Sequence, residues 1–116
     1  MPDLFSTLNP QDVIWVNYPY EDDATKSKRR PAIIVDKDND NYEVVVVKVT
    51  SQPPRDDYDY EIIEWTKALL KKPSVARASK IEVIAKDDIL SKIGTLDAED
   101  FKEIIRLINE YIGKNN

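Results

Sequence analysis

The sequence predicts a mainly β fold, a small antiparallel barrel with one helix packed on it. Several short runs of β-branched and aromatic residues, separated by polar turns, predict the strands, and an amphipathic run near the C-terminus predicts the helix. The chain has 116 residues, which is enough for one hydrophobic core and too few for two, so a single domain over residues 1–116 is expected.

Three strands are expected in the first half of the chain, after an N-terminal extension over residues 1–11. Residues 12–18 are rich in β-branched and aromatic side chains and predict the first strand, which ends at Pro19. Pro31 can open the second strand, and the polar residues 36–41 predict a hairpin turn into a third strand over 44–49. The four consecutive valines at 44–47 predict a strand that is buried on both faces.

The second half is expected to alternate short elements before the helix. Residues 52–57 predict a loop, 58–63 an extended segment and 65–70 a short helix ended by Pro73. Two strands are expected at 74–77 and 80–85, the latter with Ile81, Val83 and Ala85 on its apolar side. The final helix is predicted over 97–113, with Asp97 as its N-cap and Asp100 as the reciprocal capping partner.

Composition excludes several kinds of chemistry. The chain contains no cysteine and no histidine, which removes disulfides, thiolate metal sites and every imidazole-based catalytic pair. No metal or other cofactor is expected. The N-terminus lacks a basic segment followed by an apolar one, so we expect a cytoplasmic protein without a membrane segment.

The charge distribution restricts where a polyanion could bind. The net charge is −5, which disfavours nucleic acid as a partner of the chain as a whole. Four cations are nevertheless clustered between Lys26 and Arg30, directly before the second predicted strand. This run is the candidate for a local phosphate-binding patch.

A guanidinium and two hydroxyls lie at the ends of two predicted strands. Arg30 precedes the second strand, and Thr50 and Ser51 end the third. The planar fork of arginine donates two parallel hydrogen bonds to a phosphate and stays charged at any working pH, and a hydroxyl can both donate and accept. The pattern therefore favours a site that holds and polarises a phosphodiester.

With these residues in this order, the chain resembles the PemK/MazF family of toxins from type II toxin–antitoxin systems, over residues 12 to about 111. The motifs that carry the resemblance are Asp12-Val13-Ile14-Trp15-Val16, Tyr18-Pro19-Tyr20, Lys28-Arg29-Arg30-Pro31-Ala32, Val49-Thr50-Ser51-Gln52, Trp65 with Lys72-Pro73-Ser74, and Ile93-Gly94 with Leu96 before Asp97-Ala98-Glu99-Asp100.

The resemblance implies an SH3-like or CcdB-like barrel, a homodimer, a cognate antitoxin as partner, and metal-independent cleavage of single-stranded RNA by its own 2′-OH. It implies Arg30, Thr50 and Arg77 as catalytic residues. Lys28, Arg29, Ser51, Gln52 and Ser79 are expected to bind the substrate. Ser79 stands where some members of the family have an aspartate that acts as acid or base.

Several alternatives remain open from the sequence. The chain could be a catalytically inactive member that works as a protein-binding or inhibitory module, or an SH3-like module that binds peptides. Glu21 and Asp22 could supply a general base, although solvated loop carboxylates are the simpler interpretation. Trp15 is expected in the core, and Trp65 could pack or stack on bases.

Overall fold

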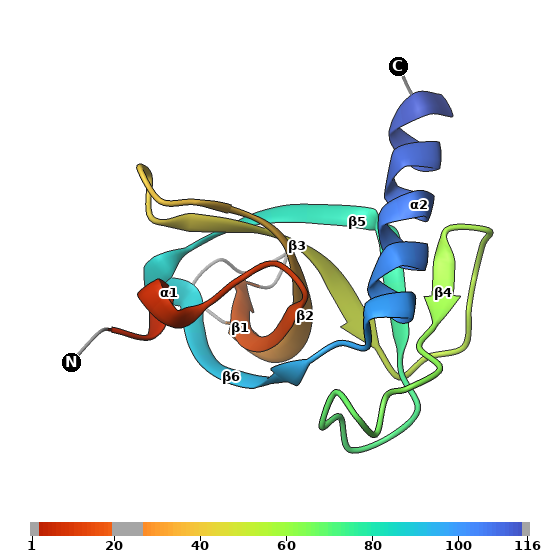
Figure 1. The fold of residues 1–116 in the computed structure, drawn as a ribbon, viewed down its shortest axis with the longest axis horizontal. Helices are drawn as coiled ribbons and strands as arrows, with labels where there is room; N and C mark the ends of the chain where they lie inside the picture. Colours follow the sequence, from red (N-terminus) through yellow and green to blue (C-terminus); the bar gives the residue numbers. More distant parts are fainter. Residues whose placement is uncertain (1–2, 20–26, 115–116) are drawn as a thin grey trace.

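The computed structural model describes residues 3–19 and 27–114 and shows a curled antiparallel sheet with a long helix at one end (Figure 1). The loop with Glu21 and Asp22 lies outside the described residues. In chain order the elements are α1 (Leu4–Thr7), β1 (Asp12–Pro19), β2 (Ser27–Asp38), β3 (Glu43–Thr50), β4 (Asp59–Glu61), β5 (Val75–Ala85), the 3₁₀ turn η1 (Lys86–Asp88), β6 (Ile89–Thr95) and α2 (Ala98–Lys114).

The six strands form one sheet in the order β4-β5-β3-β2-β1-β6, and every neighbouring pair is antiparallel. Strands β4 and β6 are its two edges, so the sheet is strongly curled but not closed, as Figure 1 shows. The mainly β class with a C-terminal helix is confirmed. The closed barrel is corrected to an open sheet, because β4 has only three residues and pairs with β5 alone among the described strands.

The central strands are buried on both faces, as the valine run predicts. Ile33 and Val47 belong to a cluster covered by α2 and by residues 62–70, whereas Ile34 and Val46 belong to a second cluster inside the curl. Phe5 and Leu8, from the N-terminal segment, complete the second cluster. Because side chains alternate along a strand, the central strands contribute residues to two hydrophobic cores, one on each side of the sheet.

Four local expectations are wrong. Pro31 does not open the second strand, because β2 begins at Ser27 and both Arg30 and Pro31 are paired with β1 inside it. Residues 65–70 form turns and not a helix, because Leu69 adopts a left-handed φ of 64°, which does not continue a helix. The strands expected at 74–77 and 80–85 are one strand, β5. Its register against β3 shifts between Arg77 and Ile81, which reverses the expected facing of the second part: Ile84 is buried and Val83 is 59% exposed.

The helix α2 begins as expected but uses its acidic residues differently. Asp97 caps it, since its carboxylate accepts the backbone N–H of Glu99 at 3.1 Å. Asp100 is buried and turns away from the cap. It accepts hydrogen bonds from the Tyr60 hydroxyl at 2.5 Å and from the backbone N–H groups of Ile63 and Glu64 at 3.1 and 2.8 Å. The capping box is therefore half correct, and Asp100 instead fixes the 62–64 segment to the helix.

Gly94 in β6 is required by a close backbone approach. A Cβ at this position would lie 2.3 Å from the carbonyl oxygen of Ala68. We expect Gly94→Ala to lower the free energy of unfolding by about 2–3 kcal/mol, because the overlap can be relieved only by moving the backbone of β6 or of Ala68. Urea unfolding measures the change. Gly113→Ala is the matched control, since a Cβ there meets nothing within 4 Å, and equal unfolding midpoints for the two variants would contradict this account.

Candidate functional site

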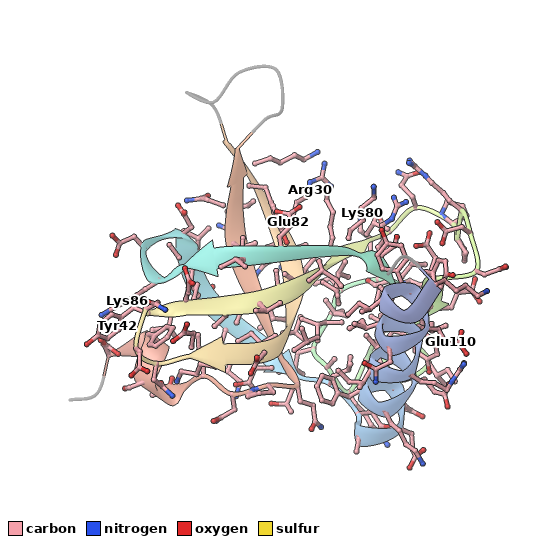
Figure 2. All side chains as sticks on the ribbon, turned by 90° about the horizontal axis from the view of Figure 1, so that it is seen from above. Arg30, Tyr42, Lys80, Glu82, Lys86 and Glu110 are labelled. Carbon is pink, nitrogen blue, oxygen red and sulfur yellow. The ribbon has the colours of Figure 1, made fainter. Side chains whose placement is uncertain are left out.

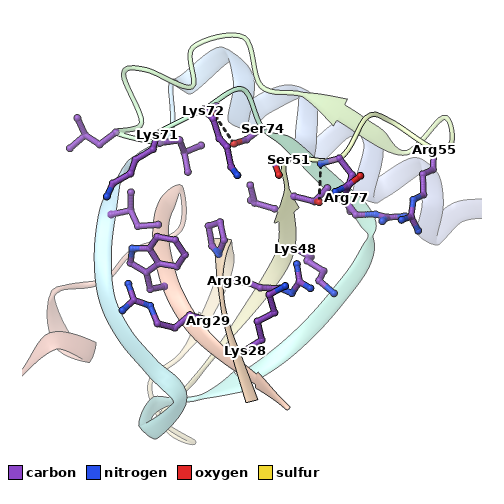
Figure 3. A pocket seen from close by; sticks show the side chains of 18 residues that line it. Lys28, Arg29, Arg30, Lys48, Ser51, Arg55, Lys71, Lys72, Ser74 and Arg77 are labelled. Atoms are coloured by element: carbon purple, nitrogen blue, oxygen red, sulfur yellow. Dashed lines mark hydrogen bonds between the residues drawn. The ribbon is translucent and has the colours of Figure 1, made fainter. Parts of the chain in front are cut away.

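A cavity of about 650 Å³ opens where β2 separates from the end of β3 (Figure 3). The last paired residues of this ladder are Ala32 and Lys48, and beyond them β2 pairs only with β1. The gap is closed at its far side by the loop before β5. Residues from five strands and two loops line it: Trp15, Lys28, Arg29, Arg30, Pro31, Lys48, Val49, Thr50, Ser51, Gln52, Arg55, Leu69, Leu70, Lys71, Lys72, Ser74, Arg77 and Ile93.

The wall of this cavity is strongly basic. Eight of the 17 lysines and arginines of the chain line it, and no carboxylate among the described residues does. The eight are Lys28, Arg29, Arg30, Lys48, Arg55, Lys71, Lys72 and Arg77. In a chain of net charge −5, such segregation creates a local positive potential that attracts a polyanion.

Strand alternation divides the β2 segment into two sides. Lys28 and Arg30 project to one side, toward Lys48, and Arg29 projects to the other (Figure 3). The guanidinium of Arg29 lies 4.8 Å from the ring centre of Trp15, a cation–π distance. The first part of β2 therefore presents cations on both of its faces.

Arg30 and Thr50 face the same cavity from neighbouring strands. Continuing the register from the Ala32–Lys48 pair places Arg30 level with Thr50, and both side chains are half-buried. The Thr50 hydroxyl oxygen accepts the backbone N–H of Gln52 at 3.1 Å, which turns the chain after β3. Its own hydrogen remains available to an oxygen in the cavity.

Arg77 enters from β5, directly opposite Lys48 in the β3–β5 ladder. Its side chain is 13% exposed, and its Nε lies 3.5 Å from an oxygen of Asp59, whose side chain is 1% exposed. Arg77 thus lines the cavity and also pairs with a buried carboxylate.

Comparison with known proteins bears on the family of the chain. The profile of the PemK-like, MazF-like toxins of type II toxin–antitoxin systems matches residues 9–112. The chain belongs to this toxin family. No curated protein sequence is similar to it at a significant level.

Solved structures of PemK/MazF toxins share the fold. A MazE–MazF complex from Deinococcus radiodurans superposes with a TM-score of 0.74 at 14% identity, covering 91% of this chain and 96% of that one. An endoribonuclease in complex with its cognate antitoxin from a mycobacterial species gives a TM-score of 0.71 at 16% identity, over 92% and 96% of the two chains. The Mycobacterium tuberculosis toxin MazF-mt6 gives 0.64 at 18% identity, over 86% and 96%.

Seven of the eight site residues expected for this PemK/MazF member line the cavity. They are Arg30, Thr50, Arg77, Lys28, Arg29, Ser51 and Gln52. Ser79 does not line it, because the register shift of β5 places residues 78–80 between the paired Arg77 and Ile81. Their catalytic and binding roles stay predictions.

Sequence reasoning missed four of the cations in this family member's cavity. Lys48 shares the face of Thr50 by strand alternation, so the strand pattern could have indicated it. Arg55, Lys71 and Lys72 come from loops, and no sequence pattern places them there. Trp15, expected in the core, is partly exposed and lines the cavity.

A second groove, of about 860 Å³, continues from the basic cavity of the toxin fold through Ser51, Gln52 and Ser74, which line both. Its other walls include Pro53, Pro54, Tyr60, Trp65 and Pro73, and no cation among the described residues lines it. The surface of this family member therefore passes from a basic region to one that is rich in proline and aromatic residues and that also contains the carboxylates of Asp59 and Glu61. Among residues 3–19 and 27–114, no acidic cluster has the composition to hold a metal ion, and no helix is long and apolar enough to cross a membrane.

Tyr18 belongs to the cluster inside the curl, and its hydroxyl is close enough to Glu82 and Arg30, both labelled in Figure 2, for their charges to act on it. Its hydroxyl is buried and makes no hydrogen bond with the described residues. Burial, followed by the negative charge of Glu82, raises the pKa of Tyr18, while Arg30 opposes the shift. Burial and the hydrogen bond to Asp100 also raise the pKa of Tyr60.

Both tyrosines are expected to make the fold sensitive to alkali. Phenols of an unfolded chain titrate at about pH 10. Because both folded pKa values are higher, the stabilisation is fully present below that pH and is lost as the pH rises above it. Urea unfolding of wild type, Tyr18→Phe and Tyr60→Phe between pH 7 and 11 measures this, and each variant should lose less stability than wild type over that range.

At pH 7 the same two variants should change stability in opposite directions. Tyr18→Phe removes a buried hydroxyl without a partner and should raise the free energy of unfolding by about 1 kcal/mol. Tyr60→Phe removes a hydrogen bond to a carboxylate and should lower it by about 2 kcal/mol. Effects of the same sign would show that the Tyr18 hydroxyl is not the unpaired group described here.

Proposed function

We propose that this chain is an endoribonuclease that cleaves single-stranded RNA. The observation that carries the proposal is the cavity that Arg30, Thr50 and Arg77 line together with six further cations, while no carboxylate among the described residues lines it. Membership of the toxin family and the fold shared with endoribonucleases support it.

The chemistry is an attack by the RNA on itself. The 2′-oxygen bonds to the adjacent phosphorus and gives up its proton to a base from solvent or the protein. The bond from phosphorus to the 5′-oxygen breaks, and that oxygen takes up a proton. The products are a 2′,3′-cyclic phosphate and a free 5′-hydroxyl, and neither a histidine nor a metal is needed because the nucleophile belongs to the substrate.

The protein aligns the attack and stabilises the charge that grows on the phosphorane oxygens. Arg30 and Arg77 are suited to that charge, and the Thr50 hydroxyl can donate to the 2′-oxygen or to a phosphate oxygen. An arginine is a poor base because it stays protonated in proteins. We therefore assign Arg30 to electrostatic stabilisation.

The test is incubation of the purified protein with mixed-sequence single-stranded RNA in EDTA. Cleaved RNA with cyclic phosphate and 5′-hydroxyl ends is expected. A related active MazF toxin serves as the positive control. Intact RNA beside a cleaved control would overturn the proposal.

The proposal includes a cognate antitoxin, a homodimer and a cytoplasmic location. An acidic segment of an antitoxin would complement the same eight cations and would compete with RNA. Similar toxins have been solved in complexes with their antitoxins, which supports this partner class. The antitoxin complex is tested by measuring whether the co-expressed antitoxin displaces RNA from the toxin. The homodimer is tested by measuring the mass of the purified toxin by light scattering.

A second candidate function is a family member that has lost cleavage and acts by binding a protein. The position of Ser79 outside the cavity and the partial neutralisation of Arg77 by Asp59 favour it. In that case expression would still arrest growth when Arg30 is replaced by alanine. Loss of arrest in this variant would favour the nuclease.

A further inference from the structure

Asp59 is a buried carboxylate that touches two parts of the basic cavity without lining it. Its side chain is 1% exposed. One oxygen lies 3.5 Å from Nε of Arg77, and the other accepts the backbone N–H of Arg55 at 2.8 Å. Arg55 and Arg77 both line the basic cavity, whereas Asp59 lines the neighbouring groove.

The backbone around Asp59 is held independently of its side chain. Asp59 and Arg77 are directly paired residues of the β4–β5 ladder. The N–H of Ala78 donates to the carbonyl of Tyr58 at 3.0 Å, and the N–H of Asp59 donates to the carbonyl of Asp56 at 3.2 Å. The carboxylate is therefore presented to Arg77 from a fixed position.

A carboxylate in such a place is costly unless it is paired. Among the described residues, Arg77 is the one cation within 4 Å of it. The contact is long for a charged pair, and neither Asp59 Oδ1 nor Arg77 Nε makes a hydrogen bond among the described residues. The pair thus restrains the arginine without using all of its donors.

The contact with Asp59 is through Nε, so the two terminal amino groups of the Arg77 fork remain for a ligand. A long arginine side chain otherwise samples many rotamers, and a fixed fork loses less entropy when it binds a phosphate. Holding a charged donor in place before the substrate arrives is a general requirement of electrostatic catalysis.

We propose that Asp59 is a positioning residue for RNA cleavage: its buried carboxylate orients the Arg77 guanidinium and fixes the Arg55 loop at the cavity. This inference rests on the proposed endoribonuclease function. It adds a residue from β4, at the edge of the sheet, to a site otherwise formed by cations and hydroxyls.

Positioning and simple charge balance predict different kinetics. Asp59 places a negative charge behind a basic wall, so a role in charge balance alone would make its removal tighten RNA binding and leave kcat unchanged. A positioning role makes kcat fall, because a misplaced donor no longer meets the charge of the transition state.

The experiment compares Asp59→Asn with Asp57→Asn at one ionic strength. Both variants remove one negative charge, but Asp57 is exposed and outside the cavity. For Asp59→Asn we expect kcat to fall by about 10-fold to 100-fold with KM unchanged or lower, and for Asp57→Asn neither constant should change by more than about 2-fold. An unchanged kcat in Asp59→Asn would overturn the proposal.

A second variant covers the case in which Asp59→Asn does not fold. Asp59→Glu retains the charge and moves the carboxylate by one methylene, so positioning again predicts a loss of kcat, whereas charge balance predicts none. Wild-type kcat in a folded Asp59→Glu would overturn the proposal.

A readout without RNA separates this inference from the proposed function. Because Arg77 Nε is buried beside the Asp59 carboxylate, its Nε–Hε signal in a ¹⁵N NMR spectrum of the full chain should exchange slowly with water. This protection should disappear in Asp59→Asn, where the guanidinium is no longer held in that place, but not in Asp57→Asn. Exchange as fast as that of free arginine in the wild type would refute the positioning itself. A protected signal in a wild-type protein that cleaves no RNA would instead refute the proposed function, and with it the catalytic part of the inference.

Discussion

Replacing Arg30 by alanine is expected to lower kcat for RNA cleavage by about 10²-fold to 10³-fold, the usual cost of losing one donor to a developing oxyanion. Arg30 lines the cavity on the flank that also holds Lys48, and its register places it level with Thr50. The variant should also cancel growth arrest on expression. Initial rates on single-stranded RNA and colony growth measure the two effects.

Arg106→Ala is the matched control for this variant. Arg106 is an exposed arginine on α2 that pairs with Glu103 and Glu110 and does not line the cavity. It should keep both wild-type cleavage and growth arrest. Wild-type rates in Arg30→Ala, with a normal melting temperature, would remove Arg30 from the catalytic role.

The second large effect concerns stability. Asp100→Ala should lower the free energy of unfolding by about 4 kcal/mol, because it leaves three donors without their shared acceptor, two of them backbone N–H groups. For a chain of this size the melting temperature should fall by more than about 10 °C. Thermal unfolding followed by circular dichroism measures this.

Asp97→Ala provides the comparison three residues earlier. Asp97 caps the helix through one backbone N–H, so its loss should cost about 1 kcal/mol. If the two variants were equally stable, Asp100 would be an ordinary residue of the first helical turn and not the anchor of the 62–64 segment.

The sequence was sufficient where one periodic pattern governs an element. The β-branched runs of β1, β2 and β3 and the apolar face of α2 predicted where these elements lie, because burial on defined faces requires that spacing. The start of β2 was not predicted, since the strand begins at Ser27 and not at Pro31. No strand was predicted at β6, because its sequence Ile-Leu-Ser-Lys-Ile-Gly-Thr lacks a regular alternation and most of its side chains are exposed. The prediction also failed at β5, where the register shift breaks the alternation that it assumed.

The residues of the candidate site likewise fall into those that the sequence could predict and those that it could not. Arg30 and Thr50 could be proposed because each adjoins a strand that the pattern predicts. Lys71, Lys72 and Arg55 reach the cavity only through the path of two loops, which tertiary contacts determine. The capping role of Asp100 was mistaken because local spacing contains no information about Tyr60, 40 residues away in sequence.

The wall of the basic cavity extends along the chain from Trp15 in β1 to Ile93 in β6. Synthesis therefore has to proceed through most of the polypeptide before the last wall residue leaves the ribosome. A nascent or prematurely terminated chain that ends before β6 contains the Arg30 run but lacks part of the enclosure around it. Translation itself thus delays the appearance of a complete site in the cell that makes this protein.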